Sequence, residues 1–226
     1  MARSRRTSRS SRTKAPSAGA RARTVWLCLM GAMTAVGGSL LLLDRQHAPR
    51  VDGRTMPALA ATGTTFNLES VLKTNRPLDK PRWKAIVIHH SDSPVGSPES
   101  IAREHTKLGF KGIGHHFVVG NGRGMDDGDL HVTYRWMEQY PGAHAGGRNE
   151  KFFNNNAISI CLVGDGAREH FTAAQVQRTA ALVDKLCDEL GIARDKVYLH
   201  RDIAPTADPG SLFPERQFRA MIAQGQ

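Results

Sequence analysis

One uninterrupted apolar segment divides this chain of 226 residues into parts that fold under different constraints. The segment, residues 25–43, is nineteen residues long and contains no charged side chain. A helix of that length measures about 28 Å, close to the thickness of a bilayer core. Cleavable signal peptides have shorter apolar regions, of about 7 to 15 residues. The sequence therefore predicts one N-terminal transmembrane helix that acts as an uncleaved signal anchor, with cleavage near the Gly-Gly-Ser at 37–39 as the alternative.

The residues before this segment carry most of the net charge. Residues 1–24 contain eight lysines or arginines and no acidic residue, so they hold +8 of the formal +10. A basic tail can bind nucleic acid, but this one has no interleaved aromatic residues and leads directly into the apolar segment. We therefore expect a cytoplasmic tail and no nucleic-acid partner, with a membrane-anchored nucleic-acid binder as the weaker alternative. Because positive charge stays in the cytoplasm, the C-terminal domain is expected in the periplasm or outside the cell.

Residues 44–80 show no sustained hydrophobic period, which predicts a linker with one short ordered piece at 66–73. The remaining residues, 81–226, are enough for a single hydrophobic core. Two of the three cysteines in the chain fall here, at Cys161 and Cys187, within apolar runs. We expect buried thiols rather than a disulfide, and the lack of a Cys-x-x-Cys motif excludes a sulfur-rich zinc site.

Apolar runs that predict strands alternate with helical patterns along this domain. The strands are expected at 85–88, 115–120, 157–164 and 197–200. The helices are expected at 98–108, 172–190 and 213–222. The second helix has the clearest signals, a capping-box pair of Thr172 and Gln175 and a stop at Gly191. A long loop, 125–147, has the length of a functional loop. The alternation predicts an α/β fold with a single mixed central β-sheet flanked by helices.

Three potential metal ligands lie at the ends of predicted strands or in the loop that follows. His89 follows the first apolar run, His200 ends the last one, and Asp208 lies eight residues further on, before Pro209 and Gly210. Two histidines and a carboxylate are typical ligands of a catalytic zinc. Three protein ligands leave a fourth position for water, whose pKa the metal lowers to about 7. A histidine at a strand end is more often structural, so the set predicts a hydrolase only if the three residues converge.

Five motifs, in this order, resemble those of a known family. They are WKAIVIHHSD, GIGHHFVVGNGRG, GAHAGGRN, NAISICLVGDG and VYLHRDIAPTADPG. The sequence is similar to the zinc-dependent N-acetylmuramoyl-L-alanine amidases of the phage-lysozyme and peptidoglycan-recognition-protein superfamily, over roughly the last 140 residues. The resemblance implies a zinc enzyme that cleaves the amide between N-acetylmuramic acid and the L-alanine of the stem peptide. It also implies peptidoglycan or a muropeptide as the substrate, and we expect a monomer.

The resemblance also assigns the metal ligands. Because strand side chains alternate, only one of two adjacent histidines can point at a given metal, and the resemblance selects His89 rather than His90. His90 is then left to line the groove. Asp208 stands where phage and recognition proteins have cysteine, and it matches the third ligand of bacterial cytoplasmic anhydro-muropeptide amidases. We therefore expect Zn²⁺ on His89, His200 and Asp208.

The proton-transfer residue is open between two interpretations. His115 takes the position of the catalytic tyrosine of phage-type relatives, and Cys161 takes that of the glutamate base of the cytoplasmic enzymes. His115 is the candidate general acid/base, because histidine titrates near neutral pH. In the other interpretation His115 only orients the substrate and the water needs no dedicated base. Thr206 stands where relatives have lysine or threonine and is a candidate for binding the oxyanion.

Other residues are candidates for substrate binding. His144, in the GAHA motif, is expected to line the groove, and Arg135 and Trp136 to contact sugar or stem-peptide carboxylates. For Trp136, packing in the core is slightly favoured over this role. A non-catalytic peptidoglycan-recognition module is the alternative function, since many members of the superfamily have lost a zinc ligand. This chain has candidates for all three ligands, which favours catalysis.

Overall fold

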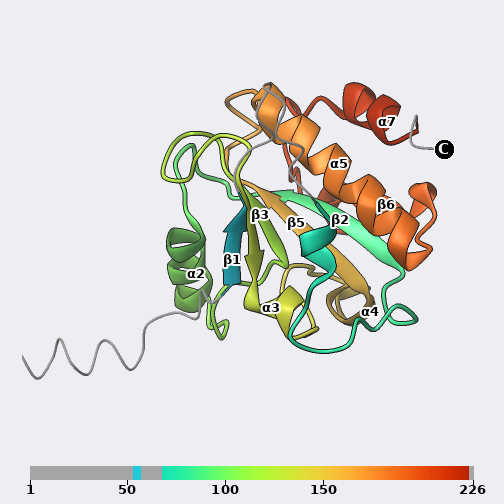
Figure 1. Cartoon of the computed structure of the whole chain (residues 1–226). Coiled ribbons are helices and arrows are strands. Elements are labelled where there is room, and N and C mark those ends of the chain that lie inside the picture. Colours follow the sequence, from blue (N-terminus) through green and yellow to red (C-terminus); the bar gives the residue numbers. More distant parts are fainter. Residues whose placement is uncertain (1–52, 57–67, 224–226) are drawn as a thin grey trace, which may run out of the picture. The chain divides into compact units, whose positions relative to one another are not determined.

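The computed structural model describes residues 53–56 and 68–223, and a six-stranded mixed sheet lies at the centre of this domain (Figure 1). The strands are β1 (Gly53–Met56), β2 (Ala85–His90), β3 (Phe117–Val119), β4 (Leu130–Thr133), β5 (Ala157–Leu162) and β6 (Val197–Leu199). They lie in the order β1-β4-β3-β5-β2-β6. β2 is parallel to β5 and β6, and β3 to β5, whereas β4 is antiparallel to β1 and β3. The predicted single mixed sheet is confirmed.

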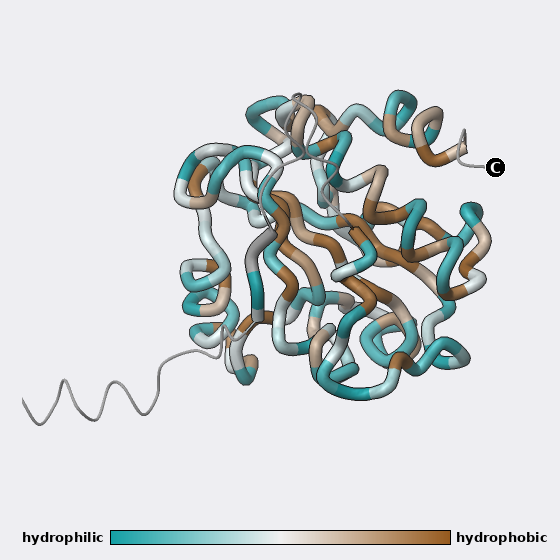
Figure 2. The backbone as a smooth tube through the Cα atoms, viewed as in Figure 1, coloured by the Kyte–Doolittle hydropathy of each residue, from teal (hydrophilic) through white to brown (hydrophobic). Residues whose placement is uncertain are grey.

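Helices flank this sheet on both faces. They are η1 (Leu68–Leu72), α2 (Pro98–Lys107), α3 (Tyr134–Met137), α4 (Glu150–Asn156), α5 (Ala173–Leu190), η2 (Arg194–Lys196), α6 (His200–Ile203) and α7 (Glu215–Ala223). α5 and α7 share the main hydrophobic core with one face of the central strands, and α2 packs with the other face. Figure 2 shows the hydrophobic residues gathered along the central strands and the side of α5 that faces them.

The capping residues expected from the sequence are in place. The Thr172 side chain accepts a hydrogen bond from the backbone N–H of Gln175, whose side chain accepts one from Thr172. Gly191 ends α5 in the left-handed conformation, with φ 67°. α2 begins with a capping box at Ser97 and has Pro98 in its first turn. Both predicted helices are therefore confirmed.

Side-chain alternation along β2 decides which face of the sheet receives the functional residues. Ile86 and Ile88 are fully buried in the core shared with α5. Val87 and His89 consequently point to the opposite face, toward the α2 side. Cys161 of β5 is paired in register with His89 and is a free buried thiol, as is Cys187. The prediction of buried thiols is confirmed.

The segment 125–147 is not one long loop, contrary to the prediction. Residues 130–133 form β4 and residues 134–137 form α3. The sequence pattern did not predict β4, because its four residues, LHVT, mix apolar and polar types although all four are buried. β4 also pairs with β1, so residues 53–56 of the predicted linker contribute an edge strand to the sheet. The short ordered piece expected near the end of that linker is η1.

The predicted basic tail and transmembrane segment lie outside the described residues. Within residues 53–56 and 68–223, no helix is long and apolar enough to cross a membrane.

Candidate functional site

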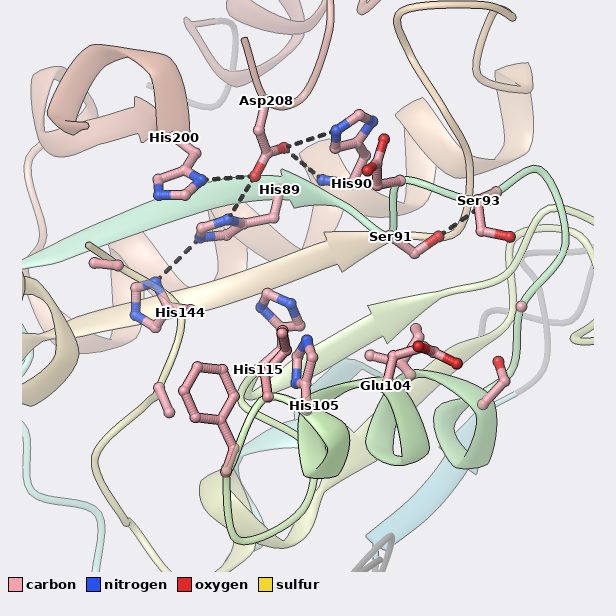
Figure 3. Close-up of a pocket in the computed structure, with 18 of the residues that line it drawn as sticks. His89, His90, Ser91, Ser93, Glu104, His105, His115, His144, His200 and Asp208 are labelled. Atoms are coloured by element: carbon pink, nitrogen blue, oxygen red, sulfur yellow. Dashed lines mark hydrogen bonds and ion pairs between the residues drawn. The ribbon is translucent and has the colours of Figure 1, made fainter. Parts of the chain in front are cut away.

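Two histidines and one carboxylate from distant segments converge at the end of β2 (Figure 3). The Nδ1 atom of His89 lies 2.9 Å from Oδ2 of Asp208, and Nδ1 of His200 lies 2.7 Å from the same oxygen. One donor atom from each residue lies within 4.8 Å of the other two. The sheet register explains the approach, because Ile88 is paired with Leu199 and the two histidines directly follow them.

The loop that carries Asp208 is held from several sides. The backbone N–H of His90 donates to Oδ1 of Asp208 at 2.7 Å. The backbone N–H of Asp208 donates to Oγ1 of Thr206 at 3.2 Å. Gly210 has φ 94°, and a Cβ there would lie 2.1 Å from the carbonyl carbon of Gly166. Only glycine lets this loop pack so closely against the segment after β5, which explains the Asp-Pro-Gly motif.

The protonation states of the three residues suit metal binding. Burial lowers the pKa of His89, although the Asp208 carboxylate opposes this shift. Burial alone would raise the pKa of Asp208, but charge interaction with His89 and hydrogen bonds with His200 and His89 lower it overall. A neutral imidazole and an ionised carboxylate are the forms that bind metals. The nitrogen and oxygen donors present therefore fit a zinc ion.

His144 contacts the ring nitrogen of His89 that does not face Asp208. Its Nδ1 atom lies 3.1 Å from Nε2 of His89, so the two rings hydrogen-bond. The side-chain oxygen of Asn154 accepts from the backbone N–H groups of His144 and Ala145, at 2.8 and 2.9 Å. Such partners fix the ring orientation of a metal-binding histidine. Sequence reasoning placed His144 in the groove, which it does line, but missed Asn154, a residue of α4 in an Asn-Asn-Asn run without a motif.

His115 lies beside the metal-ligand candidates. Its ring centroid is 5.0 Å from that of His89 and 5.1 Å from that of His105. Its Nδ1 atom lies 2.6 Å from Oγ of Ser159, a buried residue of β5. Burial and the neighbouring His89 hold the pKa of His115 well below its usual value. Nothing in the pattern of a buried strand singles out Ser159, so sequence reasoning missed it.

A cavity of about 730 Å³ opens over these residues. His89, His115, His144, His200 and Asp208 line one part of it, and residues of α2 line another. His90 also lines the cavity, with its Nδ1 atom accepting a hydrogen bond of 3.0 Å from the backbone N–H of Gly166.

Two candidate substrate-binding residues, Arg135 and Trp136, do not line this cavity, and Trp136 packs in the core, the position its sequence favours. Trp136 has no exposed surface, and its indole N–H donates to the carbonyl of Val71 at 2.7 Å. The ring belongs to the hydrophobic core because α3 turns it toward the sheet. Arg135 donates instead to the backbone carbonyls of Ile113 and Pro141, and it ties the α3 turn to neighbouring loops.

Thr206 is exposed and does not line the cavity. Its hydroxyl oxygen accepts the N–H of Asp208, so in this structure it shapes the turn that presents the carboxylate.

Comparison with known proteins agrees with this geometry. The family model for N-acetylmuramoyl-L-alanine amidases matches residues 79–211. The endolysin of Enterobacteria phage T3 is 30% identical over 141 residues, which are 58% of this chain and 83% of the endolysin. The N-acetylmuramoyl-L-alanine amidase LysC from Clostridium intestinale URNW has a TM-score of 0.54 and 26% identity, covering 66% of this chain and 92% of LysC. Drosophila peptidoglycan recognition protein SD shares the fold, with a TM-score of 0.50, 14% identity, and coverage of 75% of this chain and 87% of that protein.

Proposed function

Because the chain belongs to the N-acetylmuramoyl-L-alanine amidase family, we propose that it hydrolyses the amide joining the lactyl group of N-acetylmuramic acid to L-alanine. The observation that carries the proposal is the convergence of His89, His200 and Asp208 at the edge of a cavity. A site of this kind accepts a peptide amide and a water molecule together. The substrate is then peptidoglycan or a muropeptide.

We propose that His89, His200 and Asp208 hold one zinc ion. Zinc bound there would lower the pKa of a water molecule and polarise the scissile carbonyl. Asp208 contributes its ionised carboxylate, held in place by the backbone N–H of His90. His144 keeps the ring of His89 in one orientation through the bond between their nitrogens.

We propose that His115 moves the proton that leaves the water and reaches the departing amine. Its bond with Ser159 leaves Nε2 as the nitrogen free for this task. The alternative role is orientation of the substrate carbonyl, with no dedicated base. Thr206 supports catalysis through Asp208, because its hydroxyl fixes the turn before the carboxylate.

The experiment is mass spectrometry of muropeptides after digestion by the full chain supplied with zinc. Release of free stem peptides that begin with L-alanine is the expected result. Binding to sacculi without any release would favour the alternative, a non-catalytic recognition module.

We also propose the placement expected from the N-terminal charge pattern. Residues 1–24 would lie in the cytoplasm and residues 25–43 would anchor the chain. The linker would be shorter than the predicted 44–80, because β1 and η1 already belong to the amidase domain, which would be monomeric and lie in the periplasm or outside the cell. Added protease should then digest the domain from the non-cytoplasmic side only. A mature N-terminus beyond residue 38 would replace anchoring with secretion.

A further inference from the structure

The α2 helix presents one face to the cavity. Ile101, Glu104, His105 and Leu108 recur at spacings of three and four residues, so they lie on the same side of the helix. All four line the cavity. Figure 3 shows Glu104 on α2, on the opposite side of the pocket from His200 and Asp208. The helix therefore forms a wall across the pocket from the proposed metal ligands.

Exposed apolar side chains line the cavity at and beyond both ends of this wall. Within the described residues, three of the four large hydrophobic side chains that are exposed line the cavity. They are Val95, Leu108 and Phe110, with exposed fractions of 56%, 72% and 39%. Apolar groups that gather at the mouth of a pocket mark a surface that a ligand covers.

The fixed charge on this wall is negative. Glu104 and Asp92 line the cavity, and no lysine or arginine does so in the described part of the chain. Glu104 forms an ion pair of 2.7 Å with Lys107, whose own side chain lies outside the lining. With exposed fractions of 66% for Glu104 and 70% for Lys107, this pair is weak and screened by solvent. The Glu104 carboxylate is therefore available to a cation in the pocket.

Building on the amidase function proposed above, we propose that this wall selects stem peptides in which a diamino acid side chain ends in a free primary ammonium. Such a side chain has an aliphatic stem and a cationic tip. The stem packs against Leu108, one helical turn from Glu104, and the ammonium donates to the Glu104 carboxylate. Acylation of that amine, as in a cross-linked stem, replaces the cation by a neutral amide. The enzyme therefore prefers stem peptides that are not cross-linked through this amine.

The test uses two soluble muramyl peptides that are identical except that the terminal amine of the diamino acid is free in one and N-acetylated in the other. kcat/KM is measured for both with the full chain supplied with zinc. The wild-type protein should prefer the free amine by about fivefold, the upper size of one partly exposed ion pair.

Three variants separate a specific contact from a general change in charge. Glu104→Gln should bring kcat/KM on the free-amine peptide down to the value on the acetylated one. Lys107→Gln should increase the preference, because it removes the competing cation. Glu99→Gln is the matched control, since it lies on the same helix, loses the same charge and does not line the cavity. It should keep the wild-type preference, and circular dichroism should show that all three variants fold.

The outcomes separate this specificity from the activity itself. Equal rates on the two peptides in the wild-type protein would overturn the specificity and leave the amidase function standing. The same holds if Glu104→Gln keeps the full preference, or if Glu99→Gln loses as much as Glu104→Gln. Cleavage of neither peptide would overturn the amidase function, and the specificity with it.

Discussion

Two pairs of adjacent histidines have the same sequence but different surroundings. In the first pair, His89 and His90, both rings line the cavity. In the second pair, His115 lines the cavity, while His116 has no exposed surface and lies outside it. The ring of His116 meets that of Trp83 edge-on, with centroids 5.1 Å apart. The first pair therefore contributes both of its residues to the cavity. The second pair contributes His115 to the cavity and His116 to the buried interior.

The difference follows from the position of each pair in the sheet. His90 is the last residue of β2, and beyond it the backbone of Gly166 reaches its ring. His116 lies just before β3 and is still held between two strands. Its N–H donates to the carbonyl of Ser159, and its carbonyl accepts from Thr133. The side chain of a histidine at the end of a strand can rotate toward the cavity. A histidine whose backbone is hydrogen-bonded to strands on both sides points to the face of the sheet that strand alternation sets.

The largest effect is expected at the first pair. His89→Ala should prevent binding of the proposed zinc ion and lower kcat/KM by about 10³-fold or more, because a catalytic metal contributes several kcal/mol of transition-state stabilisation. His200→Ala and Asp208→Ala should behave in the same way. Metal analysis and muropeptide release are measured together, with His170→Ala, an exposed histidine, as the control. Stoichiometric zinc in His200→Ala would show that the ligand assignment is wrong.

The second pair offers a smaller effect of a different kind. His115→Ala should lower turnover by about 10²-fold while the zinc content stays the same, since general acid/base groups contribute about that much. His115→Tyr should recover part of the rate, because a phenol hydroxyl can also transfer a proton and tyrosine is the residue that the family resemblance implies here. Loss of zinc from His115→Ala, or an unchanged rate, would contradict proton transfer by His115.

Much of the structure around the two histidine pairs was predictable from the sequence. Continuous apolar runs located β2, β5 and β6, and the resemblance selected His89 rather than His90 as the candidate metal ligand. The convergence of His89, His200 and Asp208 agrees with the resemblance, because parallel neighbouring strands bring their carboxyl ends together. Each motif and each strand pattern spans only a short run of neighbouring residues, so both can be recognised in a single sequence.

What the sequence missed depends on contacts between distant segments. Arg135 was a candidate for contact with the substrate, but its guanidinium donates to the backbone carbonyls of Ile113 and Pro141. Ser159 and Asn154 hold His115 and the His144 loop through bonds that span 44 and 10 positions in the chain. Neither residue stands in a motif. A serine in a buried strand and an asparagine in a polar run acquire their roles only from tertiary packing.

The buried member of the second pair should affect stability rather than catalysis. Burial lowers the pKa of His116 to about 3. Its Nδ1 atom accepts from the N–H of Ser159 at 3.0 Å, and its Nε2–H donates to the carbonyl of Tyr140 at 3.1 Å. His116→Gln should therefore lower the free energy of unfolding at pH 7 by about 1–3 kcal/mol, because a buried hydrogen bond is lost.

The same residue should make stability depend on pH. Between an ordinary pKa of about 6.5 and the lowered value in the folded state, the unfolded chain binds a proton that the folded chain does not. The free energy of unfolding therefore falls as pH drops below about 6.5, by about 1.4 kcal/mol per pH unit from this group. Urea unfolding of wild type and His116→Gln from pH 7 to pH 4 measures the difference. Parallel stability curves would mean that folding does not lower the pKa of His116.

The smallest effect is expected at His90, the partly buried second member of the first pair. The backbone N–H that holds Asp208 remains in any non-proline variant, so zinc content should not change. His90→Ala removes a ring that accepts from Gly166 at 3.0 Å and whose Nε2 lies 3.8 Å from Oδ1 of Asp208. The hydrogen bond is worth about 0.5–1.5 kcal/mol and the longer contact adds little, so kcat/KM should fall by at most about tenfold. His90→Asn can place its side-chain oxygen near the position of Nδ1 and should restore most of the rate. A loss of zinc from His90→Ala, or a fall in rate as large as that of His89→Ala, would show that both members of the first pair bind the metal.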